Sequence, residues 1–206
     1  MVTQLATFCD RMVYDLEVRM KLLKDIENYQ TNIEQEVLDK EIILDHLRYT
    51  KDIFLRENQT AHMTASAWVI NHDSSKTLMI YHNIYDSWSW LGGHADGETN
   101  LLNVAIKEVK EESGLLTVHP VTEDIFSIEI LTVDGHEKRG TYVPSHLHLN
   151  VTYLLQADEE DELIIKPDEN SGVQWFELDK AVEASTEPWF KERIYEKLNE
   201  KLKNRA

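Results

Sequence analysis

Three glutamates stand at positions where a helix would gather their carboxylates. Glu108, Glu111 and Glu112 lie at i, i+3 and i+4, and residues at these spacings share one face of an α-helix. Carboxylate oxygens suit a hard divalent cation such as Mg²⁺, whose coordination is completed by water and by substrate phosphates. The spacing predicts a divalent-metal site for phosphate chemistry, although the triplet alone also fits an acidic helix surface.

The residues around the three glutamates favour a metal site over an acidic helix surface. The double glycine Gly92-Gly93 precedes it, and Gly114 follows it as a candidate left-handed helix cap. We expect the helix to run from 101 to 113, with Ala105 and Val109 facing a sheet. A strand, a glycine loop and a rigid helix with converging carboxylates then follow one another along the chain.

The stretch from Gly92 to Leu115 resembles the Nudix box of the Nudix hydrolase superfamily. That box is Gly, five residues, Glu, seven residues and then Arg-Glu-U-x-Glu-Glu-x-Gly-U, where U is aliphatic. Residues 107–115 match the second half except that Lys107 replaces the arginine. The Gly-Gly-His-Ala-Asp-Gly sequence is similar to that of a variant subgroup, and the resemblance extends from about Thr64 to Asp179.

The first half of the box can be aligned in two ways. Counted from Gly93, the total length is right but the box glutamate falls at Thr99. Counted from Gly92, Glu98 is in place and the following gap is one residue longer. The supporting role of Glu98 therefore stays open.

The resemblance implies hydrolysis of a diphosphate linkage with Mg²⁺ or Mn²⁺ as cofactor. The substrate would be a small nucleoside-diphosphate-type or sugar-nucleotide compound. Members of the family hold the metal and activate the attacking water with the box glutamates, here Glu108, Glu111 and Glu112. The further metal ligands that the resemblance implies are Gly93, through its carbonyl, and Glu169. Glu98 and Lys107 would support these groups, Lys107 less directionally than an arginine.

Substrate contacts are predicted at several aromatic and histidine side chains. His146 and His148 alternate along a strand, so they face the same side and could bind a metal or a phosphate, or form a polar strand face. His94 directly follows the glycine pair. Trp88 and Trp90 also alternate, and a ring here could stack on a nucleobase for about 1–3 kcal/mol, while one of the two should be core.

The resemblance, together with strands interspersed with helices, implies a Nudix α/β/α sandwich with a mixed sheet and an N-terminal helical extension. Apolar periodicity indicates helices at 10–29 and 33–56, the second with a capping box at Asn32 and Gln35. We place the extension at 1–60 and the Nudix hydrolase domain at 61–206. The helices would pack on the sandwich or join two copies into a homodimer. The expected strands are 65–70, 77–81, 125–133, 146–155 and 173–176, and the last helix is 188–203.

Composition narrows the class of protein. The chain has 206 residues, 42% of them hydrophobic, and one cysteine, so an internal disulfide is excluded. Its 21 basic and 38 acidic residues give a net charge of −17, which disfavours nucleic acid as a partner. No stretch reaches the roughly 20 apolar residues of a membrane helix, and no signal peptide is visible. We expect a cytoplasmic protein without membrane contact.

Two alternatives share the fold. An isopentenyl-diphosphate isomerase-like enzyme would need a cysteine near the start of the Nudix region, but the single cysteine is Cys9. A non-catalytic, ligand-sensing Nudix domain would tend to lose box glutamates and to carry a DNA-binding module. This chain keeps all three glutamates, which favours the hydrolase.

Overall fold

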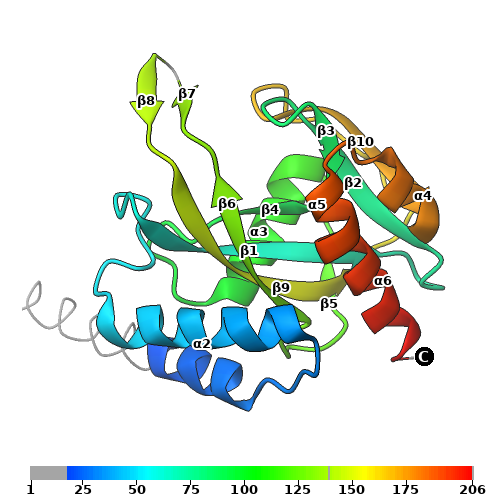
Figure 1. The fold of residues 1–206 in the computed structure, drawn as a ribbon. Coiled ribbons are helices and arrows are strands. Elements are labelled where there is room, and N and C mark those ends of the chain that lie inside the picture. The colour runs from blue at the N-terminus through cyan, green and yellow to red at the C-terminus, as the bar shows by residue number, and fades with distance from the viewer. Residues whose placement is uncertain (1–17, 139, 206) are drawn as a thin grey trace, which may run out of the picture. The chain divides into compact units, whose positions relative to one another are not determined.

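The structure is a computed structural model, and it describes residues 18–138 and 140–205 (Figure 1). These residues form two compact units. The first consists of 18–64, His94–Leu101 and Ile128–Asn150, and the second of Ala65–Gly93, Leu102–Ser127 and 151–205. Strands β1 (Ala61–Ile70) and β9 (His146–Gln156) contribute residues to both units. We describe each unit by itself.

The first unit contains two helices, at 18–28 and at α2 (Glu34–Tyr49). The part of the first predicted helix that precedes residue 18 lies outside the described residues. The second predicted helix is too long, because it ends at Tyr49 instead of continuing to 56. The backbone beyond it bonds elsewhere: the Ile53 carbonyl accepts from the Met63 amide at 2.7 Å, and that of Phe54 from the Gly97 amide at 2.9 Å.

The predicted capping box at the start of α2 is also wrong. The N-cap residue is Ile33, whose side chain makes no capping hydrogen bond. The turn is organised instead around the buried carboxylate of Glu36. This group accepts hydrogen bonds from the hydroxyls of Tyr29 and Thr31, at 2.9 and 2.5 Å.

The first unit also holds most of a long hairpin. Strands β6 (Ser127–Val133) and β9 pair, which confirms the predicted pairing of these segments. The connection between them carries a small antiparallel hairpin of β7 (His136–Lys138) and β8 (Thr141–Val143). This small hairpin was not predicted.

Five strands run through the second unit in the order β10-β2-β1-β9-β5, where β10 is Asn170–Glu177, β2 is Lys76–His82 and β5 is His119–Pro120. The short strand β3 (Ser87–Ser89) pairs with β2, and β4 (Leu91–His94) pairs with β1. Pairing of Ile70 with Thr77 confirms the predicted β1–β2 hairpin. Strand β1 begins at Ala61, earlier than predicted.

Helix α3 (Leu101–Ser113) has the predicted bounds, and Gly114 closes it with φ +76°. The unpredicted helix α4 (Leu178–Ala184) follows β10. The predicted C-terminal helix is continuous but contains a π-helical turn, since α5 (Pro188–Phe190) leads through η1 (Lys191–Tyr195) into α6 (Glu196–Lys203). In the core, the Trp68 and Tyr195 rings stack at 5.7 Å. Among the described helices, none is long and apolar enough to cross a membrane.

Candidate active site and a histidine cluster

Glu112 is the most deeply buried of the three helix carboxylates, with 4% of the residue exposed. Its Oε2 accepts a hydrogen bond from the Gly92 backbone N–H at 3.0 Å. Burial raises the pKa of Glu112 well above its ordinary value, and the nearby charges of Glu108 and Glu169 add to this effect. The hydrogen bond from Gly92 opposes it. Glu112 therefore joins α3 to Gly92, which lies in strand β4 and not in the expected glycine loop. A cation beside this buried carboxylate would favour its ionised form.

Gly93 lies directly against Glu108. A Cβ on Gly93 would be 2.5 Å from the Glu108 carboxyl carbon and 2.7 Å from its Oε2. Only glycine leaves room for the carboxylate in this position. Burial raises the pKa of Glu108, and the ion pair with Lys107 opposes the rise.

Lys107 and Lys166 link the carboxylates of Glu108, Glu111 and Glu169. The Lys107 Nζ lies 3.0 Å from Oε1 of Glu108 and 3.4 Å from Oε1 of Glu111. The Lys166 Nζ lies 3.6 Å from Oε2 of Glu111 and 2.9 Å from Oε2 of Glu169. Glu169, predicted as a further carboxylate, is thus brought to the helix glutamates. Lys166 was not singled out from the sequence, because the pairing depends on how its loop packs.

The segment between β9 and β10, which carries Glu169, is fixed to the end of α3 by two hydrogen bonds. The Ile164 amide donates to the Ser113 carbonyl at 2.8 Å, and the Asn170 Nδ2 donates to the Glu112 carbonyl at 2.9 Å. A Cβ on Gly114 would lie 2.6 Å from Cβ of Ile164. These close contacts hold Glu169 near the carboxylates of α3.

Glu98 and Thr99, the two alternatives for the first glutamate position of the box, differ in burial. Glu98 is exposed, and its Oε1 accepts from the Asn100 amide at 2.7 Å, just before α3 begins. Thr99 is buried, and its hydroxyl has no hydrogen-bond partner among the residues described. The first contact ties Glu98 to the turn just before α3.

Of the two tryptophans, Trp90 is buried and packs its ring against Tyr195 at 6.0 Å. It is the core residue of the pair, as expected. Trp88 is half-buried, with ring contacts to Tyr81 at 5.5 Å and to Phe176 at 4.8 Å. Its role in substrate binding stays a prediction.

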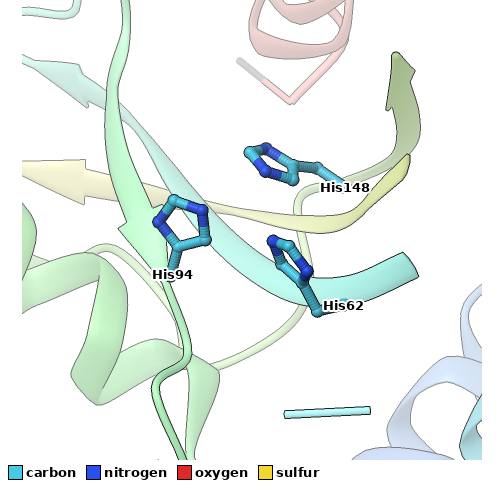
Figure 2. A group of neighbouring side chains, drawn as sticks. All are labelled: His62, His94 and His148. Carbon is cyan, nitrogen blue, oxygen red and sulfur yellow. The ribbon is translucent and has the colours of Figure 1, made fainter. Parts of the chain in front are cut away.

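Four histidines of the first unit gather in one cluster. The sequence predicted sites at His94, His146 and His148, and the structure adds His62, whose ring centroid lies 5.1, 4.8 and 4.9 Å from theirs (Figure 2 shows all but His146). His62 was missed because the strand was expected to begin after it. Burial, the first cause, and the neighbouring histidines lower the pKa of His148 to about 2. Burial also lowers the pKa of His62.

Comparisons with known proteins confirm the resemblance to the Nudix family. The family profile described as NUDIX domain matches residues 60–198. The chain therefore belongs to the Nudix family and is a Nudix hydrolase, a pyrophosphohydrolase with the α/β fold of that family and an N-terminal helical segment. Hydrolases of the family act on small phosphorylated substrates and generally need divalent metal ions.

Solved structures of similar fold share little sequence with this chain. The Nudix hydrolase RenU of M. smegmatis is 14% identical with a TM-score of 0.50, over 70% of this chain and 88% of its own. The E. coli dihydroneopterin triphosphate pyrophosphohydrolase is 15% identical with a TM-score of 0.48, over 66% and 92%. The C. elegans Ap4A hydrolase, in a binary complex, is 17% identical with a TM-score of 0.44, over 69% and 95%. No curated protein matches the sequence.

Proposed function

We propose that the protein hydrolyses the diphosphate linkage of a small nucleoside-diphosphate-type substrate with Mg²⁺ or Mn²⁺. The convergence of Glu108, Glu111, Glu112 and Glu169 beside the two glycines of β4 is the observation that carries this proposal. The oxygen donors fit a hard cation. The raised pKa values of Glu108 and Glu112 mean that ionising these carboxylates costs free energy when no cation is bound. The Gly93 carbonyl is the fifth proposed ligand.

When bound, the metal would neutralise the diphosphate and lower the pKa of water. The protein itself positions the carboxylates. Gly92 holds Glu112 through its amide, and the missing side chain of Gly93 admits Glu108. Water attacks phosphorus, the anhydride P–O bond breaks, and a carboxylate of the cluster accepts the proton from the water. Lys107 and Lys166 balance part of the negative charge.

Substrate contacts belong to the same proposal. Trp88 would stack on the base, since its half-buried ring is held edge-on by Tyr81 and Phe176. His94, His146 and His148 stay sequence predictions as substrate contacts.

A product-release screen tests the proposal. Nucleoside diphosphates and triphosphates, nucleotide sugars and dinucleoside polyphosphates are each incubated with Mg²⁺ or Mn²⁺. We expect turnover of at least one class with metal and none in EDTA. Absence of metal-dependent turnover over the whole set would contradict the proposal.

We further propose that the N-terminal helices form a homodimer interface. Leu38, Ile42 and Tyr49 are exposed apolar residues on one side of α2, with exposed fractions of 60%, 45% and 81%, and Asp45 lies between the last two. Light scattering should find a dimer at micromolar concentration and a monomer for Leu38→Lys. The control is Leu116→Lys, at a residue that is 86% exposed outside this helix. A monomeric wild type would overturn the dimer.

A further inference from the structure

Three imidazoles of the first unit converge on one point, and we propose that they bind a borderline divalent transition-metal ion, best matched by Zn²⁺. His62 on β1, His94 on β4 and His148 on β9 each offer a ring nitrogen, and these three atoms all lie within 4.8 Å of one another. Figure 2 shows the three rings turned toward a common space. This donor set shares no residue with the proposed glutamate site.

The spacing is close to that of a bound ion. Zinc–nitrogen distances of about 2.0–2.1 Å place the nitrogens of tetrahedral ligands about 3.4 Å apart. Binding would draw the three nitrogens together through rotation of the rings. All three histidines are carried by strands.

The hydrogen bond of His62 fixes which of its nitrogens can bind a metal. Its Nδ1 lies 2.9 Å from the Asn58 carbonyl oxygen. That oxygen can only accept, so Nδ1 carries the proton and Nε2 presents a lone pair. Nε2 is buried and has no hydrogen-bond partner in the described part of the chain. Metal-ligating histidines typically make this arrangement, with the second ring N–H donated to a backbone carbonyl.

His146 fixes the tautomer of His148 in a similar way. The Nδ1 of His146 lies 2.8 Å from the Pro144 carbonyl oxygen, so it is protonated, and its Nε2 accepts. The partner of that Nε2 is Nε2 of His148, at 3.2 Å, which must therefore donate. Nδ1 of His148 is left with its lone pair. His146 is thus a positioning residue for the proposed ligand.

These lone pairs favour a cation over an anion. A phosphate accepts hydrogen bonds and would need protonated nitrogens, whereas His62 and His148 present acceptors. Among the charged residues, Arg56 and Asp96 act on the pKa of His62, in opposite directions. They form a two-point ion pair with each other. Imidazole nitrogens suit zinc, copper or nickel, while Mg²⁺ prefers oxygen. Three protein ligands leave a fourth position for water or another oxygen, as in open zinc sites.

Titration of the metal-free 206-residue chain tests the site. Isothermal calorimetry with Zn²⁺ and visible absorption with Co²⁺ report affinity and geometry separately. We expect one ion per chain with the intense absorption of tetrahedral Co²⁺. His62→Ala, His94→Ala and His148→Ala should each abolish that absorption, and His146→Ala should weaken binding by about 10–100-fold. The exposed His72→Ala serves as the matched control and should bind as wild type.

Glu112→Gln separates this inference from the proposed hydrolase site. Tetrahedral Co²⁺ binding should survive in that variant, even if hydrolysis is lost. If Co²⁺ gives only the absorption of octahedral oxygen coordination, without the tetrahedral bands, or if the histidine variants leave zinc binding unchanged, the inference is overturned. If an alanine variant does not fold, ¹⁵N shifts of the wild-type imidazoles decide: Zn²⁺ must move Nε2 of His62, and an unmoved signal refutes the site.

Discussion

The carboxylate of Glu112 and the backbone amide of Gly92 are joined by a 3.0 Å hydrogen bond. This contact links two parts of the Nudix box that are 20 residues apart in the chain. It joins α3 to strand β4, while Gly93 makes room for Glu108. The two glycines thus position the carboxylates of Glu112 and Glu108.

Glu112→Gln should remove most of the hydrolytic activity and leave the protein folded. The amide keeps the shape and its oxygen can still accept from Gly92, but a charged ligand is lost. We expect a loss of several kcal/mol in the transition state, on the order of 10³-fold in rate. The rate is measured against Mg²⁺ and Mn²⁺ concentration. The exposed Glu160→Gln is the control, and wild-type turnover by Glu112→Gln would refute the assignment.

The same residue should make the metal-free protein less stable as the pH rises. The pKa of Glu112 is raised in the folded state, so the fold favours the protonated carboxyl. This stabilisation is complete below the ordinary value of 4.5 and is lost as the pH rises through the raised pKa. In EDTA, the melting temperature of wild type minus that of Glu112→Gln should fall with pH above about 4.5. A difference that is independent of pH would contradict the raised pKa.

Local patterns predicted the elements that carry the box, and long-range packing supplied the rest. Helix α3 and its cap at Gly114 were predictable because periodicity, glycine and carboxylates lie within one stretch. Lys166 joins the site through a loop contact with the helix end, which no local spacing encodes. His62 lies where β1 extends beyond its apolar run, so its meeting with His148 depends on strand pairing.

Alanine at the two glycines should have separable effects. On Gly93, the new Cβ meets the flexible carboxylate of Glu108, which can move aside, so the fold should survive and activity should drop by about 10²-fold. On Gly92, the Cβ would lie 2.6 Å from the Ala65 carbonyl oxygen. The backbone must then shift, at a cost of about 1–3 kcal/mol in the free energy of unfolding. Thermal melts and initial rates of both variants are compared. Equal melting temperatures for the two would contradict the packing argument.

Single substitutions at Glu98 and Thr99 distinguish the two alignments of the box. Glu98→Gln should keep near-wild-type rates, because the exposed side chain bonds to the Asn100 amide and glutamine can accept the same hydrogen bond. Thr99→Val removes a buried hydroxyl that lacks a partner within the described structure, so the free energy of unfolding should rise by about 1 kcal/mol. Rates at saturating Mg²⁺ and urea melts are measured for both. If Glu98→Gln lowers the rate tenfold or more at unchanged stability, Glu98 supports the glutamates of α3 and the alignment from Gly92 is correct. If Thr99→Val is the variant that loses rate, the alignment from Gly93 holds and the hydroxyl acts in the site.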